Sequence, residues 1–429
     1  MQFFSDINSF IDFVETRKRF SKKVSLENME YFVSLFDHPE KKFKSIHVTG
    51  TNGKGSTVSY LKNIYLKNGY NVATFTSPYV IKFNERISYN NEYISDNDLL
   101  KYGNMILAKY DYIEENNHDL PGFFEFITLL AFLYFADLKI DIAIIEVGIG
   151  GRLDATNVIT PLASVITSVG LDHVEQLGDT KELILNEKLG IVKKGVPLFT
   201  AVKEDFLLQQ MHCKCLESSS DLIKVDFERL KIKKLGLDSS KFSYKGFEDL
   251  EITLPGMHQN ENSILAVEVE NYLNKKSNLP LSCELLYEGL ISTTWPGRLE
   301  CVSKNPLIYI DGGHNIDCIK RVCEFVDSLS FNHKRVIISI SNDKDKKSMI
   351  DLLDKTFDEL VFTKYTYKRS ATSNELYDLS NSNNKKIIHN MNDVIDYCYC
   401  NRCEFTLFIG SLYLISEIRP MILNYEKKN

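Results

Sequence analysis

The hydrophobic pattern of this chain alternates between short β-branched runs and longer segments with helical periodicity. The runs are continuous and rich in β-branched residues, which is typical of strands covered on both faces. Alternation of such strands with helices predicts an α/β fold with a mostly parallel sheet. In the first half of the chain we predict strands at 45–48, 71–76, 141–147, 163–167 and 197–200.

The predicted helices differ in how their apolar residues are distributed. Residues 4–18 and 25–36 show the amphipathic pattern of short surface helices, and a further helix is expected at 257–274. Residues 123–137 are apolar almost all round, which predicts a buried helix. Ser95, followed three residues later by an aspartate, resembles a capping box at the start of another helix.

The pattern changes at two places, and these changes suggest the domain organisation. Residues 203–255 contain short, polar, alternating strands, which we interpret as an antiparallel edge extension of the first domain. The Pro-Gly pair within 294–300 is typical of a hinge, and a second α/β series follows it. We therefore predict a domain at 1–296 and a smaller, Rossmann-like domain at 297–429. The strands of the second series are expected at 307–310, 334–340, 359–362, 386–388 and 405–409.

Composition excludes several classes of protein. The chain has 429 residues, enough for two domains with cores of their own, and its net charge of −7 offers no electrostatic footprint for nucleic acid. No apolar run reaches the roughly 18 residues of a membrane span, and the N-terminus lacks the pattern of a signal peptide. We expect a cytoplasmic monomer. Its nine cysteines lack paired zinc-knuckle spacing, so we expect reduced, unliganded thiols.

A glycine-rich segment between a predicted strand and a predicted helix carries the clearest chemical signal. Backbone N–H groups of such a loop close on phosphate oxygens, and the following helix N-terminus favours an anion. Lys54 is expected to reach the outer phosphates of a nucleotide, and Ser56 or Thr57 to ligate Mg²⁺. Val48 stands where the general phosphate-loop pattern has glycine, so the spacing indicates a particular subfamily. The loop comprises Gly50, Thr51, Asn52, Gly53, Lys54, Gly55, Ser56 and Thr57.

A carboxylate at a strand end is the second chemical signal. Glu146 closes the predicted strand 141–147, at the carboxyl edge where α/β sheets bind ligands. Carboxylate and hydroxyl oxygens suit Mg²⁺, which takes only one or two protein ligands beside phosphates and water. Alternatively, Glu146 forms a structural ion pair with Arg152.

Several motifs then follow in one order, and together they resemble folylpolyglutamate synthase / dihydrofolate synthase, a branch of the ATP-dependent Mur ligase superfamily. The resemblance covers roughly residues 20 to 418 and implies a phosphate-loop central domain followed by a C-terminal domain that closes the cleft. The motifs are GTNGKGS at 50–56, Ser77-Pro78, FNERI at 83–87, FFE at 123–125, EVGIGGRLDATN at 146–157, LDH at 171–173, EKLGI at 187–191, WPGRLE at 295–300, DGGHN at 311–315 and GSLYL at 410–414.

The resemblance implies a ligase that adds L-glutamate to a folate through an acyl phosphate, using ATP and two Mg²⁺ ions. The first ion would be held at Ser56, Ser77 and Glu146, and the second at Glu146, His173 and Lys188. Lys188 would be carbamylated by CO₂, which requires a neutral amine and so a depressed pKa. Alternatively, Lys188 is a helix lysine paired with Glu187 or Glu182, and His173 caps a loop.

The resemblance also implies contacts to the substrates. Those to folate would come from Phe123, Phe124, Glu125, Leu153, Asp154 and Ala155, and less distinctly from the segment 23–27. Those to the nucleotide would come from Asn260, Arg298 and Asp311, while His314 would face the reacting groups. Structural alternatives remain: Phe124 as a core residue, Asp154 as a turn residue and Asp311 as a helix N-cap.

Two other classes of protein stay open beside this reading. Another Mur-superfamily amino-acid ligase is the nearest, but the cell-wall ligases carry a UDP-binding domain before the loop, and only 49 residues precede Gly50. A domain needs at least about 50 residues. A nucleotide-dependent switch would explain the loop but neither Glu146 nor His173. Whether dihydropteroate is accepted as well as tetrahydrofolate is left open.

Overall fold

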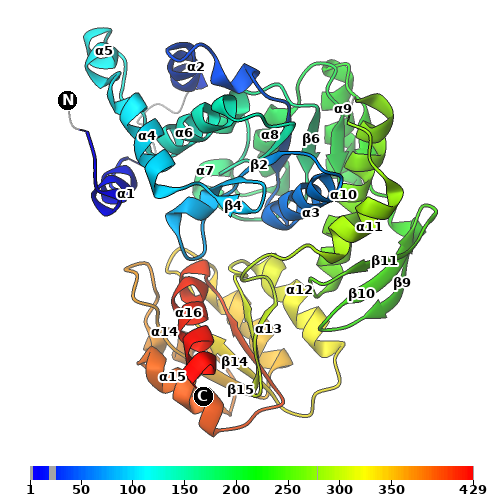
Figure 1. Cartoon of the computed structure of the whole chain (residues 1–429). Helices are drawn as coiled ribbons and strands as arrows, with labels where there is room; N and C mark the ends of the chain where they lie inside the picture. The colour runs from blue at the N-terminus through cyan, green and yellow to red at the C-terminus, as the bar shows by residue number, and fades with distance from the viewer. Residues whose placement is uncertain (1–2, 19–25, 278, 429) are drawn as a thin grey trace. The chain divides into compact units, whose positions relative to one another are not determined.

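The computed structural model describes residues 3–18, 26–277 and 279–428, and the chain folds into two compact units (Figure 1). The first unit comprises Met1–Arg229 and Glu261–Thr293, and the second comprises Leu230–Asn260 and Thr294–Asn429. The division at 293/294 lies three residues before the boundary predicted at 296/297. Residues 230–260, which we had assigned to the first domain, group with the second unit.

An eight-stranded sheet forms the centre of the first unit. The strand order is β4-β3-β2-β5-β1-β6-β7-β8, and the pairs from β2 through β8 are parallel, whereas β3 and β4 are antiparallel additions at one edge. The predicted parallel α/β sheet is therefore confirmed. The strands are β1 (Ser45–Thr49), β2 (Val72–Phe75), β3 (Ile87–Tyr89), β4 (Glu92–Tyr93), β5 (Ile142–Glu146), β6 (Ala163–Ile166), β7 (Leu198–Thr200) and β8 (Leu222–Lys224).

Helices cover this sheet, and one of them lies in the core as predicted. In α6 (Phe123–Asp137) every residue from 126 to 135 is buried, because an all-apolar helix gains most by losing contact with water on every side. Ser95 caps α4 (Asp96–Leu107), where its hydroxyl accepts the N–H of Asp98 at 3.0 Å. The other helices are α1 (Ile7–Glu15), α2 (Leu26–Ser34), α3 (Lys54–Lys67), α4 (Asp96–Leu107), α5 (Tyr110–Glu115), α7 (Val174–Leu177), α8 (Lys181–Lys188), α9 (Asp205–Glu217), α10 (Met257–Lys276) and α11 (Cys283–Ile291).

Residues 203–255, which we had interpreted as an antiparallel edge extension of the first domain, contribute to two different sheets. The first part of this segment forms α9 and the parallel edge strand β8. The second part forms a separate antiparallel sheet of β9 (Leu230–Leu235), β10 (Ser240–Tyr244) and β11 (Phe247–Ile252). An alternating polar pattern indicates a half-exposed sheet, but it does not indicate which other strands that sheet joins.

The second unit also contains a six-stranded sheet in the order β12-β13-β17-β14-β15-β16, parallel except for the pair β12–β13. Its strands are β12 (Glu300–Lys304), β13 (Leu307–Asp311), β14 (Lys334–Ile338), β15 (Glu359–Phe362), β16 (Lys385–Ile387) and β17 (Phe405–Ile409). Its helices are α12 (Ile316–Asp327), α13 (Lys346–Thr356), α14 (Ser373–Leu379), α15 (Met391–Cys400) and α16 (Leu412–Lys428). Among the described residues, no helix is both long and apolar enough to cross a membrane.

Candidate active site

The glycine-rich loop connects β1 to α3, as the sequence predicts. Gly50 has a φ of +154° and Gly53 a φ of +86°, a region that side chains other than glycine rarely adopt. A Cβ atom at Gly50 would lie 1.8 Å from the Thr167 hydroxyl oxygen, and one at Gly53 would lie 2.4 Å from the Asn262 amide oxygen. Both the backbone conformation and the close neighbours therefore require glycine at these two positions.

The carboxyl end of β6 holds this loop in place. The Thr51 N–H donates to the Ser168 carbonyl (2.9 Å), and the Asn52 N–H donates to the Ser168 hydroxyl (2.9 Å). The Thr167 hydroxyl donates to the Asn52 carbonyl at 2.6 Å. Sequence analysis did not single out Thr167 or Ser168. Their signal was their position at the end of the strand predicted at 163–167, since parallel strands end at one common edge.

Lys54 begins α3 and lies over the loop. Its ammonium donates to the carbonyl oxygens of Gly50 (2.9 Å) and Thr51 (3.3 Å). Ser56 and Thr57 lie in the first turn of the same helix and are 3% and 0% exposed. A cation on a glycine-rich loop, at the N-terminus of a helix of 14 residues, is an arrangement suited to phosphate.

Glu146 and Ser77 meet at the ends of adjacent strands. Glu146 ends β5, is 3% exposed, and its Oε2 accepts the N–H of Ser77 at 3.1 Å. Ser77 follows β2, which pairs with β5 in parallel. The structure therefore brings together two of the residues expected to hold the first metal ion.

Asp154 organises the loop that follows β5. Its carboxylate accepts the N–H groups of Gly148 (3.0 Å) and Ile149 (3.1 Å), and also the N–H (3.0 Å) and hydroxyl (2.5 Å) of Thr156. Burial nevertheless raises the pKa of Asp154. The alternative that Asp154 is a turn residue is thus correct. Its four hydrogen bonds are all within the loop, so they are not evidence for a contact with substrate. Leu153 is half-buried and Ala155 is buried beside it.

The segment that begins α6 lies against that same loop. A Cβ atom on Gly148 would lie 2.6 Å from the Phe124 ring, so the ring rests directly on this glycine. Phe124 and Phe123 are half-buried rather than enclosed in the core. Glu125 accepts the Gly122 N–H at 2.8 Å, and burial raises the pKa of the Glu125 carboxyl. Of the expected folate segment at 23–27, residues 23–25 lie outside the described part of the chain.

Lys188, at the end of α8, is 2% exposed. Burial, and to a smaller extent the charge of Lys54, lower the pKa of Lys188 to about 7, and Asp172 acts in the opposite direction. Glu187, one of the two partners considered for Lys188, instead forms an ion pair with Arg152 at 2.8 Å. Lys188 is therefore a buried amine next to Lys54, and the sequence pattern alone did not reveal this proximity.

His173 is exposed and adopts a left-handed conformation (φ +52°) just before α7. Its N–H donates to the Asp172 carboxylate at 2.9 Å, and its carbonyl accepts the N–H groups of Gln176 and Leu177 (both 2.9 Å). His173 thus stands at the N-terminal position of α7 and contributes there through its backbone. Its side chain makes no helix-capping hydrogen bond there.

In the second unit, the predicted nucleotide residues cluster around the start of β12 and the end of β13. The Asp311 carboxylate accepts the N–H groups of Leu299 (2.9 Å) and Gly313 (2.7 Å), while burial raises its pKa and Arg298 opposes that rise. His314 Nδ1 lies 2.9 Å from the Gly312 carbonyl. Asn315, not Asp311, is the N-cap of α12, so the capping alternative for Asp311 was wrong.

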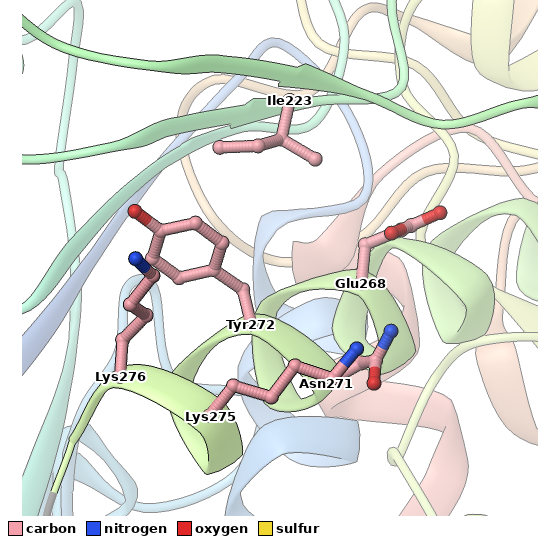
Figure 2. A pocket seen from close by; sticks show the side chains of 6 residues that line it. All are labelled: Ile223, Glu268, Asn271, Tyr272, Lys275 and Lys276. Atoms are coloured by element: carbon pink, nitrogen blue, oxygen red, sulfur yellow. The ribbon is translucent and has the colours of Figure 1, made fainter.

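Asn260 lies in the first turns of α10 and is fully buried, with its amide nitrogen 3.5 Å from the Gly256 carbonyl. None of the predicted site residues lines the cavity between β8 and the second half of α10, where the Tyr272 ring faces Ile223 (Figure 2). That cavity is a feature separate from the phosphate loop.

Comparison with known proteins identifies the family. The description "Mur ligase middle domain" matches residues 48–269, and "Mur ligase, glutamate ligase domain" matches residues 297–404. The dihydrofolate synthase/folylpolyglutamate synthase of Bacillus subtilis is 37% identical over 419 residues, covering 95% of this chain and 97% of its own. The chain belongs to the folylpolyglutamate synthase/dihydrofolate synthase branch of the Mur ligases.

Solved structures agree with this family. The folylpolyglutamate synthase from Thermotoga maritima is 32% identical and superposes with a TM-score of 0.86, covering 99% of this chain and 98% of its own. A solved FPGS–AMPPCP complex is 29% identical and superposes with a TM-score of 0.85, covering 97% of this chain and 100% of its own. The resemblance stated from the motifs is therefore confirmed at the level of the family and the fold.

The side chains predicted to hold the two metal ions of this Mur ligase can be compared with the ligands that Mg²⁺ prefers. Ser56, Ser77 and Glu146 offer hydroxyl and carboxylate oxygens, the ligand type that Mg²⁺ prefers beside phosphates. Glu146, His173 and an unmodified Lys188 offer a carboxylate, an imidazole and an amine, which suit Mg²⁺ poorly. Among the described residues no group of three or more His, Cys, Asp or Glu side chains is arranged to hold a metal. The second set fits Mg²⁺ only if Lys188 carries a carboxylate.

Proposed function

We propose that this Mur ligase joins the amino group of L-glutamate to a carboxyl group of a folate at the expense of ATP. The observation that carries the proposal is the glycine-rich loop, with Lys54 over it, at the same strand edge as the paired Glu146 and Ser77. Family membership supports the choice of reaction, because the similar B. subtilis protein is named for dihydrofolate and folylpolyglutamate synthesis.

The proposed reaction has two transfers. A carboxylate oxygen of the folate attacks the γ-phosphorus of ATP, the bond to the bridging oxygen breaks, and ADP leaves. The glutamate amine then attacks the carbonyl carbon of the acyl phosphate, loses a proton, and expels inorganic phosphate. An enzyme accelerates such steps by holding the reactants in line and by stabilising charge on the transferred group.

The residues of the first unit would divide this work. Lys54 and the loop N–H groups would bind the outer phosphates, where charge accumulates in the transition state. Ser56, Ser77 and Glu146 would hold Mg²⁺, which neutralises phosphate charge. The face formed by Phe123, Phe124 and the 153–155 loop, including Leu153 and Ala155, would take the flat pterin ring, since aromatic side chains stack on such rings. Glu125 would contact the same ligand.

Carbamylation of Lys188 is part of the proposal. Its amine is buried, and its pKa of about 7 leaves a large neutral fraction at physiological pH. A neutral amine attacks CO₂, forms a carbamate and releases one proton. The resulting anion, together with Glu146 and His173, would supply the oxygen-rich set for a second Mg²⁺ that the unmodified side chains lack.

The second unit would contribute Asn260, Arg298 and Asp311 to nucleotide binding and His314 to the reacting groups. We propose that the first unit contains both the phosphate loop and the folate site. We also propose that the protein acts as a monomer in the cytoplasm. Gel filtration coupled to light scattering would test the monomer.

The deciding experiment measures ADP release by the purified protein with ATP, Mg²⁺, L-glutamate and a folate, omitting each in turn. We expect release that requires all four, with a product heavier than the folate by one glutamyl residue in mass spectrometry. Nucleotide binding without glutamate-dependent ADP release would favour a nucleotide switch instead. The same assay with dihydropteroate and with tetrahydrofolate as the glutamate acceptor decides whether the protein uses one of these compounds or both.

A further inference from the structure

Glu85 lies in the short 3-10 helix Phe83–Arg86 that follows the Ser77 loop. Its carboxylate accepts the N–H groups of three successive loop residues. The distances are 2.7 Å from Val80, 3.1 and 3.2 Å from Ile81 to the two oxygens, and 3.0 Å from Lys82. Such charge-assisted bonds are stronger than bonds between neutral groups, so one side chain fixes three peptide groups.

The other end of the same loop is fixed by the site itself. The Ser77 N–H donates to Glu146 Oε2 at 3.1 Å, and the preceding Thr76 N–H donates to the carbonyl of Arg86 at 2.8 Å. Residues 77–82 are therefore bounded by a carboxylate at each end, Glu146 at the start and Glu85 at the finish. Ile81 and Lys82 are exposed, so without Glu85 their N–H groups would be free to bond to water.

The middle of the loop is held by Tyr79. Its hydroxyl donates to the Glu15 carboxylate at 2.8 Å, which ties the loop to α1. The guanidinium carbon of Arg86 lies 5.0 Å from the Tyr79 ring centroid and 5.3 Å from that of Phe123. Glu85 and Arg86, adjacent in sequence, thus both hold the loop, and Arg86 also joins it to the start of α6.

We propose that Glu85 is a positioning residue for the Ser77–Glu146 pair: its carboxylate holds the 77–82 loop in the conformation that keeps the Ser77 N–H on Glu146. The inference rests on the proposed function, in which Ser77 and Glu146 hold Mg²⁺ together with the nucleotide. In this proposal Glu85 affects the metal site through the loop and not by direct contact. It acts by limiting the conformations of a short, exposed loop, because a misplaced ligand binds its ion less tightly.

Glu85→Gln provides the test, because it preserves size but removes the charge and turns one acceptor into a donor that faces donors. We expect amide hydrogen exchange at 80–82 to quicken by roughly tenfold, the scale of losing a charge-assisted hydrogen bond. We expect the Kd for a non-hydrolysable ATP analogue with Mg²⁺ to rise by a similar factor. The Kd for the same analogue in EDTA should not change, since in this proposal Glu85 acts on nucleotide binding only through the metal site.

Asp141→Asn is the matched control, since the Asp141 carboxylate also accepts a loop N–H, that of Asn71 at 2.7 Å, but at the opposite end of β5 from Glu146. It should leave both dissociation constants unchanged. Glu85→Asp keeps the charge on a shorter side chain, so its exchange rates at 80–82 and its Kd with Mg²⁺ should lie between those of the parent and of Glu85→Gln. If Glu85→Gln does not fold, Glu85→Asp replaces it in the experiment.

The outcomes separate the two proposals. If exchange at 80–82 becomes faster in Glu85→Gln but the effect of Mg²⁺ on the Kd for the ATP analogue is unchanged, Glu85 stabilises only its own loop. That result would overturn the inference and leave the proposed function intact. A parent protein whose nucleotide binding is indifferent to Mg²⁺ would overturn the proposed metal site, and the inference with it.

Discussion

Lys188 and Lys54 lie close enough for the charge of one to affect the other. Burial lowers the pKa of Lys188 to about 7, and the Lys54 ammonium contributes to this shift. Lys54 is itself held over the phosphate loop by the Gly50 carbonyl at 2.9 Å. A phosphate bound at Lys54 would offset its positive charge, so nucleotide binding and the protonation of Lys188 should be coupled.

Lys188 should carry a carbamate in the active enzyme. Because its pKa is lowered, the amine is neutral above about pH 7 and charged below it, so modification and activity should both fall as pH drops from 8 to 6. Incubation with ¹³C-bicarbonate should produce one carbamate resonance, which Lys188→Ala removes together with activity. Formate or acetate should partly restore activity to Lys188→Ala.

Lys188→Arg should also be inactive, since a guanidinium stays protonated and does not react with CO₂. Lys181→Arg is the control within α8, where Lys181 pairs with Glu204 at 2.6 Å, and it should remain active. Full activity of Lys188→Arg would show that carbamylation of Lys188 is not required, and it would refute the proposed second metal site. The rest of the assignment would survive that result.

Lys54→Ala should abolish ligation and leave the fold intact. The hydrogen bonds of its ammonium to described residues are to the loop carbonyls of Gly50 and Thr51, so the loss to stability is small, whereas the loss of phosphate stabilisation should cost about 3 kcal/mol or more in the transition state. Steady-state kinetics and thermal unfolding measure the two effects. Lys67→Ala, at the other end of α3, should change neither. Turnover near that of the parent would refute the role of the loop.

Arg298→Ala should weaken ATP use far more than folate binding. The backbone on either side of Arg298 is held independently, by Gly297 N–H to Glu300 (2.8 Å) and Leu299 N–H to Asp311 (2.9 Å), so the substitution removes the guanidinium without freeing the turn. Guanidinium contacts to phosphate are not replaced by water at equal strength. We expect KM for ATP to rise at least about tenfold. Arg402→Ala, on the exposed surface of the same unit, is the control, and an unchanged KM in Arg298→Ala would move the nucleotide contact elsewhere.

Glu270→Gln should stabilise the protein at alkaline pH. Glu270 is fully buried in α10, and burial raises its pKa well above its ordinary value, while hydrogen bonding with the Tyr65 hydroxyl acts in the opposite direction. The unfolded chain loses this proton near pH 4.5 while the folded chain keeps it, so stability should fall by about 1.4 kcal/mol per pH unit above that point until the folded pKa is reached.

Urea unfolding of the parent and of Glu270→Gln between pH 5 and 8.5 measures this difference. The gap between the two should widen as pH rises. Glu284→Gln, at the exposed start of α11, should track the parent at every pH. Parallel pH profiles for the parent and Glu270→Gln would show that Glu270 does not titrate differently in the folded state.

Much of the fold was accessible from local patterns. The strands β1, β5 and β17 match predicted strand runs, and α6 matches a segment that is apolar almost all round, with both of its ends correctly predicted. The strands β9–β11 were expected at the edge of the first domain but form a sheet of their own, because an alternating pattern specifies one buried face but not the partner of that face.

The candidate site divides in the same way. The phosphate loop was predictable since its glycines, lysine and hydroxyl residues are adjacent in sequence and sit between a strand and a helix. The contacts of Thr167 and Ser168 with the loop, separated from it by more than a hundred residues, were not. The hydrogen bonds of Glu85 to its own loop were not predictable either, because the sequence FNERI does not show where the carboxylate points.

The sequence by itself determined the family, the parallel α/β architecture and the phosphate loop, because these depend on short-range backbone preferences and on motifs whose residues are neighbours in the chain. Only the tertiary structure decided the environment of those residues. The pKa of Lys188 depends on burial and on the charge of Lys54, 134 positions earlier, and the pairing of Arg152 with Glu187 removes one of the two partners that the sequence offered to Lys188. Desolvation and electrostatic interaction depend on distance in space, which the order of residues along the chain does not specify.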